Sequence, residues 1–131
     1  MSDEKIIKSK VLLAEDDASM RRFLEITLHR AGYEVVSAED GLAAMKTALS
    51  ETFDIVVADA VMPNMTGHDL CRMLRRNPNY ESTPLIILSG LEHEIAANAE
   101  QDCADIYLTK GANLKEEITE NLARVVIQKT K

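Results

Sequence analysis

The segment FDIVVADAVMPNMTG, residues 53–67, joins an apolar run to a single acid and then to a turn. The run Ile55–Val57 is β-branched, which favours a buried strand. Asp59 stands at the end of this strand, and Pro63 and Gly67 mark the turn that follows. An unpaired charge is costly to bury, so a carboxylate at the end of a buried strand indicates a function beyond packing.

The rest of the chain repeats this pattern of a short apolar run followed by a segment of helical periodicity, typical of βα units that build a parallel sheet covered on both faces. The predicted strands are residues 11–14, 34–38, 55–58, 85–88 and 106–109. Helices are expected around residues 20–31, 42–49, 70–74, 92–101 and 114–125. The strand at 34–38 is the most polar, which predicts an edge position. Gly32 is expected to close the first helix, and the alanine-rich helix at 92–101 is expected to be the least firmly anchored.

Composition limits the class of protein. The 131 residues fit one domain, which we place at residues 10–128 behind a polar tail at 1–9. The net charge of -7, from 22 acids and 15 bases, disfavours direct binding of nucleic acid. No apolar run approaches the length of a membrane span, and the charged start is unlike a signal peptide. We therefore expect a cytoplasmic protein.

Several side chains carry no motif of their own. Cys71 and Cys103 lie outside any CxxC or Cys/His cluster and are interpreted as reduced packing residues. The histidines, His68 among them, show no ligand spacing and are interpreted as surface residues. The pair Arg75 and Arg76 is interpreted as a solvated face.

Polar side chains follow four of the predicted strands. Glu15 and Asp16 follow the first strand, Asp59 the third, Ser89 the fourth and Lys110 the fifth. The carboxyl ends of parallel strands share one edge, where ligands of open α/β sheets bind. We therefore expect these five side chains to converge.

Gathered carboxylates repel one another unless a cation lies between them. Mg²⁺ prefers oxygen ligands, and one or two carboxylates plus a phosphate oxygen commonly hold it. Lys110 and Ser89 could supply a charge and a hydroxyl to a phosphoryl group, and Asp59 could form an aspartyl phosphate.

Simpler interpretations remain open for each residue alone. Asp16 and Asp17 precede a helix, where an acid favours the helix dipole or caps the first turn, and Asp17 is interpreted as a cap only. Ser89 before Gly90 could form a plain turn. Lys110 could be a solvated loop residue.

Four motifs in order resemble the receiver domain of bacterial two-component response regulators, from Lys10 to Gln128. They are VLLAEDDASMRRFLEITL (11–28), DIVVADAVMPNMTGHDLCRML (54–74), PLIILSG (84–90) and ADIYLTK (104–110). The resemblance implies a three-layer (βα)5 sandwich of flavodoxin-like α/β class, with a parallel five-stranded sheet in the order 2-1-3-4-5. It implies a signalling protein, not an enzyme in the ordinary sense, that catalyses only its own phosphorylation and slow dephosphorylation.

The resemblance also implies roles for individual residues. Asp59 would be the phosphoacceptor, and Ser89 and Lys110 would contact the phosphoryl oxygens. Tyr107 matches the aromatic position that turns inward when the hydroxyl residue moves toward the phosphoryl group. The implied ligands of Mg²⁺ are Glu15, Asp16, Asp59 and the backbone carbonyl of Val61.

The implied phosphodonor is a sensor histidine kinase or a histidine phosphotransfer protein. Phosphorylation would alter the face formed by the fourth helix, the fifth strand and the fifth helix, which would contact a downstream protein or a missing output domain. One departure is Gly111, where the family usually has a proline. Apolar Val61 and Leu91 flank the expected path of an attacking water, so we expect slow loss of the phosphoryl group.

Three rivals are weighed against this interpretation. A flavin-binding module of similar strand order is disfavoured, because no phosphate-cradling loop follows the first strand. An aspartate-nucleophile phosphatase of the haloacid dehalogenase type usually has a second acid two residues after the nucleophile, and Val61 stands there instead. A receiver-like interaction module that is never phosphorylated is favoured somewhat by Gly111.

Overall fold

A computed structural model describes residues 9–90 and 103–130 of the protein, which contain a single β-sheet. Its five strands are all parallel and lie in the order β2-β1-β3-β4-β5. They are β1 (Lys10–Ala14), β2 (Glu34–Ala38), β3 (Ile55–Asp59), β4 (Leu85–Ser89) and β5 (Ile106–Thr109). The predicted strands, the strand order and the edge position of residues 34–38 are therefore confirmed.

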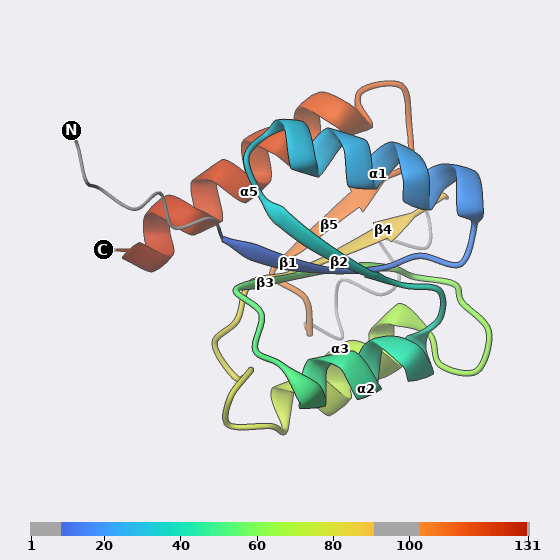
Figure 1. Cartoon of the computed structure of the whole chain (residues 1–131), viewed down its shortest axis with the longest axis vertical. Helices are drawn as coiled ribbons and strands as arrows, with labels where there is room; N and C mark the ends of the chain where they lie inside the picture. Colours follow the sequence, from blue (N-terminus) through green and yellow to red (C-terminus); the bar gives the residue numbers. More distant parts are fainter. Residues whose placement is uncertain (1–8, 91–102, 131) are drawn as a thin grey trace.

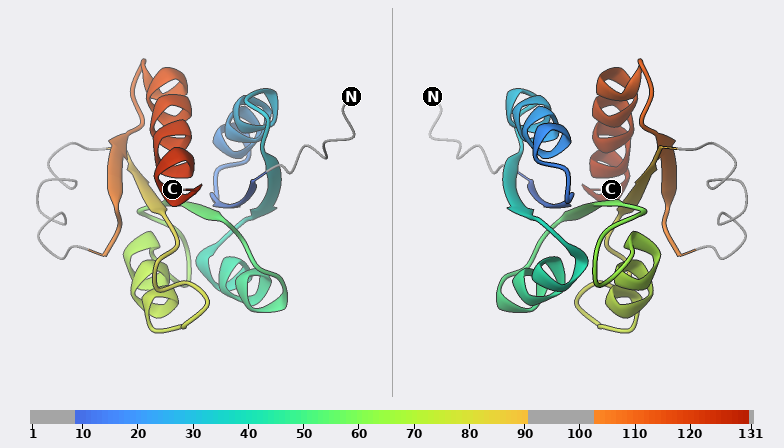
Figure 2. Two further views of the ribbon diagram at one scale, coloured as in Figure 1. Left: turned by 90° about the vertical axis from the view of Figure 1, so that its left-hand side faces the viewer. Right: turned by 90° about the vertical axis from the view of Figure 1, so that its right-hand side faces the viewer.

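In the described part of the chain, helices cover both faces of this sheet, which gives three layers (Figure 1). Helices α1 (Ala18–Arg30) and α5 (Leu114–Thr130) lie on one face, and α2 (Gly41–Ser50) and α3 (Gly67–Arg75) lie on the other, as both views of Figure 2 show. The helix predicted at 92–101 lies outside the described residues. Within the part of the chain that is described, none of the helices has the length and apolarity needed to cross a membrane.

The central strand β3 divides the apolar core into two clusters. Val56 and Ala58 belong to the cluster that packs against α2 and α3. Ile55 and Val57 belong to the cluster that packs against α1 and α5. Successive side chains of a strand point to opposite faces, so a strand buried on both faces must be apolar throughout. This alternation buries the whole of β3, including Asp59 at its carboxyl end.

The ends of α1 follow the sequence signals. The Asp17 carboxylate accepts a hydrogen bond from the backbone N–H of Met20 at 2.7 Å, so Asp17 caps the helix as expected. Gly32 follows the helix with a φ of 99°, a left-handed conformation that glycine adopts without a steric penalty. The predicted end of the helix is thus confirmed.

The expectation of a solvated arginine pair is wrong for Arg75. Arg75 is half-buried, and its guanidinium forms hydrogen bonds to both the loop before β4 and the segment before β5. It donates to the carbonyl oxygens of Tyr80 (3.0 Å), Thr83 (2.7 Å) and Cys103 (3.1 Å) and to the carboxylate of Asp105 (2.8 Å). Its partners are mostly backbone oxygens, which the sequence does not distinguish.

We predict that Arg75→Met lowers the free energy of unfolding by about 3 kcal/mol, because several buried acceptors lose a charged donor. Urea unfolding followed by circular dichroism measures this loss. Arg76→Met is the matched control, since Arg76 is exposed. Equal stabilities of the two variants would contradict the role of Arg75.

The expectation that both cysteines are reduced is also wrong in this structure. Cys71 of α3 and Cys103, shortly before β5, form a disulfide with their Cα atoms 6.0 Å apart. The two residues are 32 positions apart in the sequence, so only the fold brings them together.

Candidate functional site at the carboxyl edge of the sheet

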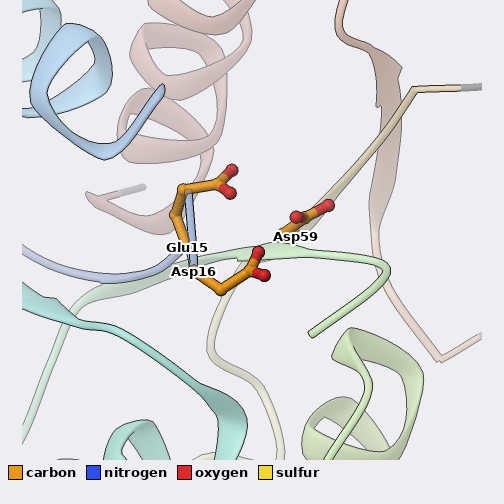
Figure 3. Close-up of side chains that lie close together, drawn as sticks. All are labelled: Glu15, Asp16 and Asp59. Carbon is orange, nitrogen blue, oxygen red and sulfur yellow. The ribbon is translucent and has the colours of Figure 1, made fainter. Parts of the chain in front are cut away.

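The carboxyl ends of β1 and β3 bring three acids together, as Figure 3 shows. Glu15 and Asp16 directly follow β1, and Asp59 is the last residue of β3. These two strands are neighbours in the sheet, with Ala14 paired to Ala58. One carboxylate oxygen of each acid lies within 4.8 Å of those of the other two. The predicted convergence of the acids is confirmed.

The three carboxylates differ in burial. Glu15 is 0% exposed and Asp59 is 7% exposed, whereas Asp16 lies in solvent. Two buried carboxylates this close repel each other in a medium of low dielectric, so the site requires a positive charge.

Lys110 supplies that charge in the structure. Its Nζ lies 2.8 Å from Glu15 Oε1 and 3.0 Å from Asp59 Oδ2. Burial alone would lower the pKa of Lys110, but its hydrogen bonds to Glu15 and Asp59 outweigh burial and raise the pKa above the ordinary value. The ammonium therefore stays protonated between the two acids. Lys110 makes both contacts although Gly111 follows it in place of the proline that is usual in the resembled family.

Glu15 is the most enclosed of the acids. Burial raises the pKa of Glu15, while its hydrogen bonds to Lys110 and to the backbone N–H of Asp17 act in the opposite direction. The Asp17 N–H donates to Glu15 Oε2 at 3.1 Å. Arg21 Nη1 also donates to the Glu15 carbonyl oxygen at 2.9 Å, which fixes the backbone of the acidic pair.

Two further predicted site residues flank the acids. Ser89 is the last residue of β4, is 2% exposed, and its carbonyl accepts a hydrogen bond from the Lys110 N–H at 2.8 Å. The backbone N–H of Val61 points to Asp59 Oδ1 at 3.4 Å, while the residue is 63% exposed. The loop after β3 therefore approaches the carboxylate with its backbone and turns the apolar Val61 toward solvent.

Tyr107 has a neighbour that the sequence did not indicate. The His68 ring, in the first turn of α3, stacks on the Tyr107 ring with centroids 6.1 Å apart and planes inclined by 25°. The interpretation of His68 as a surface residue is wrong, because it is half-buried. The Tyr107 hydroxyl is buried and has no hydrogen-bond partner among the described residues.

Gly67 allows α3 to begin directly beside the phosphoacceptor candidate. A Cβ at this position would lie 2.4 Å from the Asp59 carbonyl oxygen and 3.2 Å from Ala60 Cα. Both are backbone atoms, so the strand end itself would have to move.

We therefore predict that Gly67→Ala lowers the free energy of unfolding by about 2 kcal/mol. Chemical denaturation tests this value. Gly90→Ala is the control, because a Cβ at Gly90 meets no atom within 4 Å. A Gly67→Ala protein as stable as the control would show that the close backbone approach is absent.

The donor set fits a hard divalent cation. Three carboxylates offer oxygen atoms only, and the open side at Asp16 leaves room for water ligands. The acidic cluster could thus bind a metal ion.

The sheet order and the acidic edge define a doubly wound α/β domain with its site beyond the carboxyl ends of the strands. The sequence model of the response regulator receiver domain family matches residues 11–123. The chain belongs to this family of signalling domains of two-component systems.

Individual proteins that resemble this chain are also response regulators. The response regulator ArlR of Staphylococcus saprophyticus is 33% identical over 109 residues, which are 82% of this chain and 48% of that protein. The chemotaxis response regulator CheY4 of Vibrio cholerae is 33% identical with a TM-score of 0.83, over 91% of this chain and 99% of that one. The response regulator TrrA of Thermotoga maritima, solved in complex with Mg²⁺-BeF, is 27% identical with a TM-score of 0.81, over 90% and 98%. The chain spans about half the length of the curated relatives it matches.

Proposed function

We propose that this chain accepts a phosphoryl group on Asp59 from a phosphohistidine of a sensor histidine kinase or a histidine phosphotransfer protein. The observation that carries the proposal is the shared Lys110 ammonium between Glu15 and Asp59, beside the exposed Asp16. The ammonium offsets the charge of two buried carboxylates, and the exposed Asp16 marks the side from which a donor would approach.

Asp59 would act as the nucleophile. One carboxylate oxygen forms a bond to phosphorus as the phosphorus–nitrogen bond of the phosphohistidine breaks, and the electron pair of that bond stays on the imidazole. No acid stands beside the phosphoryl position within the loop after β3, since Val61 is apolar. A donor with a good leaving group is therefore required.

Glu15, Asp16, Asp59 and the Val61 carbonyl would hold Mg²⁺, which neutralises charge on the transferred group. The Lys110 ammonium would contact a phosphoryl oxygen, and the Ser89 hydroxyl would donate to another. Mg²⁺ binding to two or three carboxylates is supported by the oxygen-only donor set and by the Mg²⁺-BeF complex of the TrrA relative.

Phosphorylation would also act as a switch. It replaces one negative charge with nearly two and adds acceptor oxygens that draw Ser89 and Lys110 toward them. The Tyr107 ring, which lies on the same face as α3, would be held inside when Ser89 moves. The face formed by the fourth helix expected at residues 92–101, which lies outside the described residues, and by β5 and α5 would then present a different contact to a downstream protein or an output domain.

The rivals receive no support from the site. A phosphatase of the haloacid dehalogenase type usually has its second acid two residues after the nucleophile, and Val61 occupies that position here. An interaction module without phosphorylation would not require Lys110 between two acids, and Gly111 does not prevent that contact. We propose the receiver domain as residues 10–128, in the cytoplasm where such kinases act.

The deciding experiment is incubation with acetyl phosphate and Mg²⁺, followed by intact mass spectrometry and peptide mapping. We expect one phosphoryl group on the peptide that contains Asp59, and none when EDTA removes the metal. A label on another residue, or equal labelling without metal, would contradict the proposal.

Phosphoryl lifetime gives a further prediction. Val61→Asn places an amide that can orient water beside Asp59, so we expect hydrolysis of the aspartyl phosphate to become roughly tenfold faster. Release of phosphate from the labelled protein is timed against Val61→Ala, which removes bulk but adds no polar group. Identical rates for the two variants would discard an orienting role at this position.

A further inference from the structure

A disulfide joins two cysteines near Tyr107, the aromatic residue of the proposed switch. The sequence contains only Cys71 and Cys103, and they form the disulfide between α3 and the segment before β5. Cys71 is fully buried, whereas Cys103 is half-buried. An attacking thiolate can therefore reach Cys103 more readily than Cys71.

The disulfide is linked to Tyr107 in two ways, through the short chain that follows Cys103 and through helix α3, which carries Cys71. Cys103 is followed by Ala104 and Asp105 and then by β5, so Tyr107 is only four residues away. His68, which stacks on the Tyr107 ring, lies one helical turn before Cys71. Tyr107 is thus connected to α3 twice, once through its ring and once through the short chain to the disulfide.

The remaining contacts keep the segment in place without the bond. Arg75, one turn after Cys71, donates to the Cys103 carbonyl at 3.1 Å and to the Asp105 carboxylate at 2.8 Å. The same carboxylate accepts the backbone N–H of Leu85 at 2.8 Å. We therefore expect that breaking the disulfide loosens the segment before β5 but leaves it docked, so that both redox forms remain folded.

We propose that Cys71 and Cys103 form a redox modification site, whose oxidation state sets how tightly Asp59 holds its phosphoryl group. The substrate class is a thiol or dithiol for reduction and a small disulfide for oxidation. This inference rests on the proposed function, because its readout is phosphoryl binding.

The chemistry is thiol–disulfide exchange. A thiolate of the reductant attacks Cys103 Sγ, the bond to Cys71 Sγ breaks, and the Cys71 thiolate leaves and takes up a proton. A second thiol of the reductant then displaces Cys103 Sγ from the mixed disulfide. Two electrons and two protons pass to the protein, and the reductant becomes a disulfide.

The direction of the coupling follows from the present arrangement. The disulfide coexists with a buried Tyr107 hydroxyl and a stacked His68 ring. The proposed switch favours Tyr107 inside when the phosphoryl group is bound. Oxidation and phosphorylation therefore stabilise the same state, and binding linkage makes their effects reciprocal.

Calorimetric titration with Mg²⁺ and beryllofluoride, a phosphoryl mimic, tests the proposal on oxidised wild type, on wild type reduced with dithiothreitol, and on Cys103→Ser. We expect the oxidised protein to bind at least about fivefold more tightly than the other two. Conversely, beryllofluoride should shift the glutathione ratio at half-oxidation by the same factor, as alkylation and mass spectrometry measure. Cys103→Ser should respond to neither redox condition.

Equal affinities of the two redox forms would overturn the redox inference and leave the proposed function standing. Cysteines that stay reduced at every glutathione ratio would overturn it as well. A reduced wild type without native circular dichroism would make the bond a structural staple, which also overturns the inference. No binding by any form, with Asp59→Asn indistinguishable from wild type, would instead contradict the proposed function itself.

Discussion

Asp59→Asn is expected to slow phosphoryl uptake from acetyl phosphate by roughly three orders of magnitude or more. The amide is nearly the same size as the carboxylate, but it lacks the charged oxygen that would attack phosphorus. It also removes one carboxylate from the cluster with Glu15 and Asp16, so Mg²⁺ binding should weaken. A time course of intact mass measures the first effect, and calorimetry with Mg²⁺ measures the second.

Asp54→Asn is the matched control. Asp54 stands immediately before β3, at the opposite end from Asp59, and accepts the backbone N–H of Lys10. The change in net charge is the same in both variants. If Asp59→Asn takes up label as fast as Asp54→Asn, the phosphoacceptor lies elsewhere.

Lys110→Met should strengthen the binding of Mg²⁺ but slow the uptake of the phosphoryl group. The variant leaves Glu15 and Asp59 buried side by side without a cation, since the ammonium contacts both carboxylates. Mg²⁺ then relieves more repulsion than in wild type, so the affinity for the metal should rise. Uptake of the phosphoryl group should fall roughly 100-fold, because one positive charge that faces its oxygens is missing.

Stability gives an independent readout of the same substitution. Without Mg²⁺, we expect the free energy of unfolding of Lys110→Met to fall by about 3 kcal/mol, because one partner of a buried ion cluster is removed. Added Mg²⁺ should restore more stability to the variant than to wild type, since it binds only the folded site. Lys115→Met, at an exposed position of α5, serves as the control. A variant that loses both metal affinity and phosphoryl uptake would contradict the role assigned to Lys110.

The strands and the acidic cluster could be predicted because both follow from local sequence. The run Ile55–Val57 is apolar and β-branched, as a strand buried on two faces requires. Parallel strands place their carboxyl ends on one edge, so Glu15, Asp16 and Asp59 were expected there, and they meet because β1 and β3 are neighbours. The strand order came from the resemblance to the receiver family, because the periodicity of the runs is the same for several orders.

The contacts around α3 could not be predicted because they depend on how the helix lies against the sheet. Arg75 binds mainly backbone oxygens, which every residue has. Cys71 and Cys103 pair only because the segment before β5 passes beside α3. The stacking of His68 on Tyr107 similarly joins two elements that are distant in the sequence. A helical-wheel projection of α3 could have placed His68, Cys71 and Arg75 along one side, since they are three or four residues apart.

A crystal structure of the protein soaked with Mg²⁺ and beryllofluoride tests the central claim most directly. We predict a beryllofluoride group bonded to a carboxylate oxygen of Asp59, with Lys110 on one of its fluorines and Mg²⁺ held between Asp59 and Asp16. Unaltered density around Asp59 at saturating ligand, or the group bound to another side chain, would contradict it.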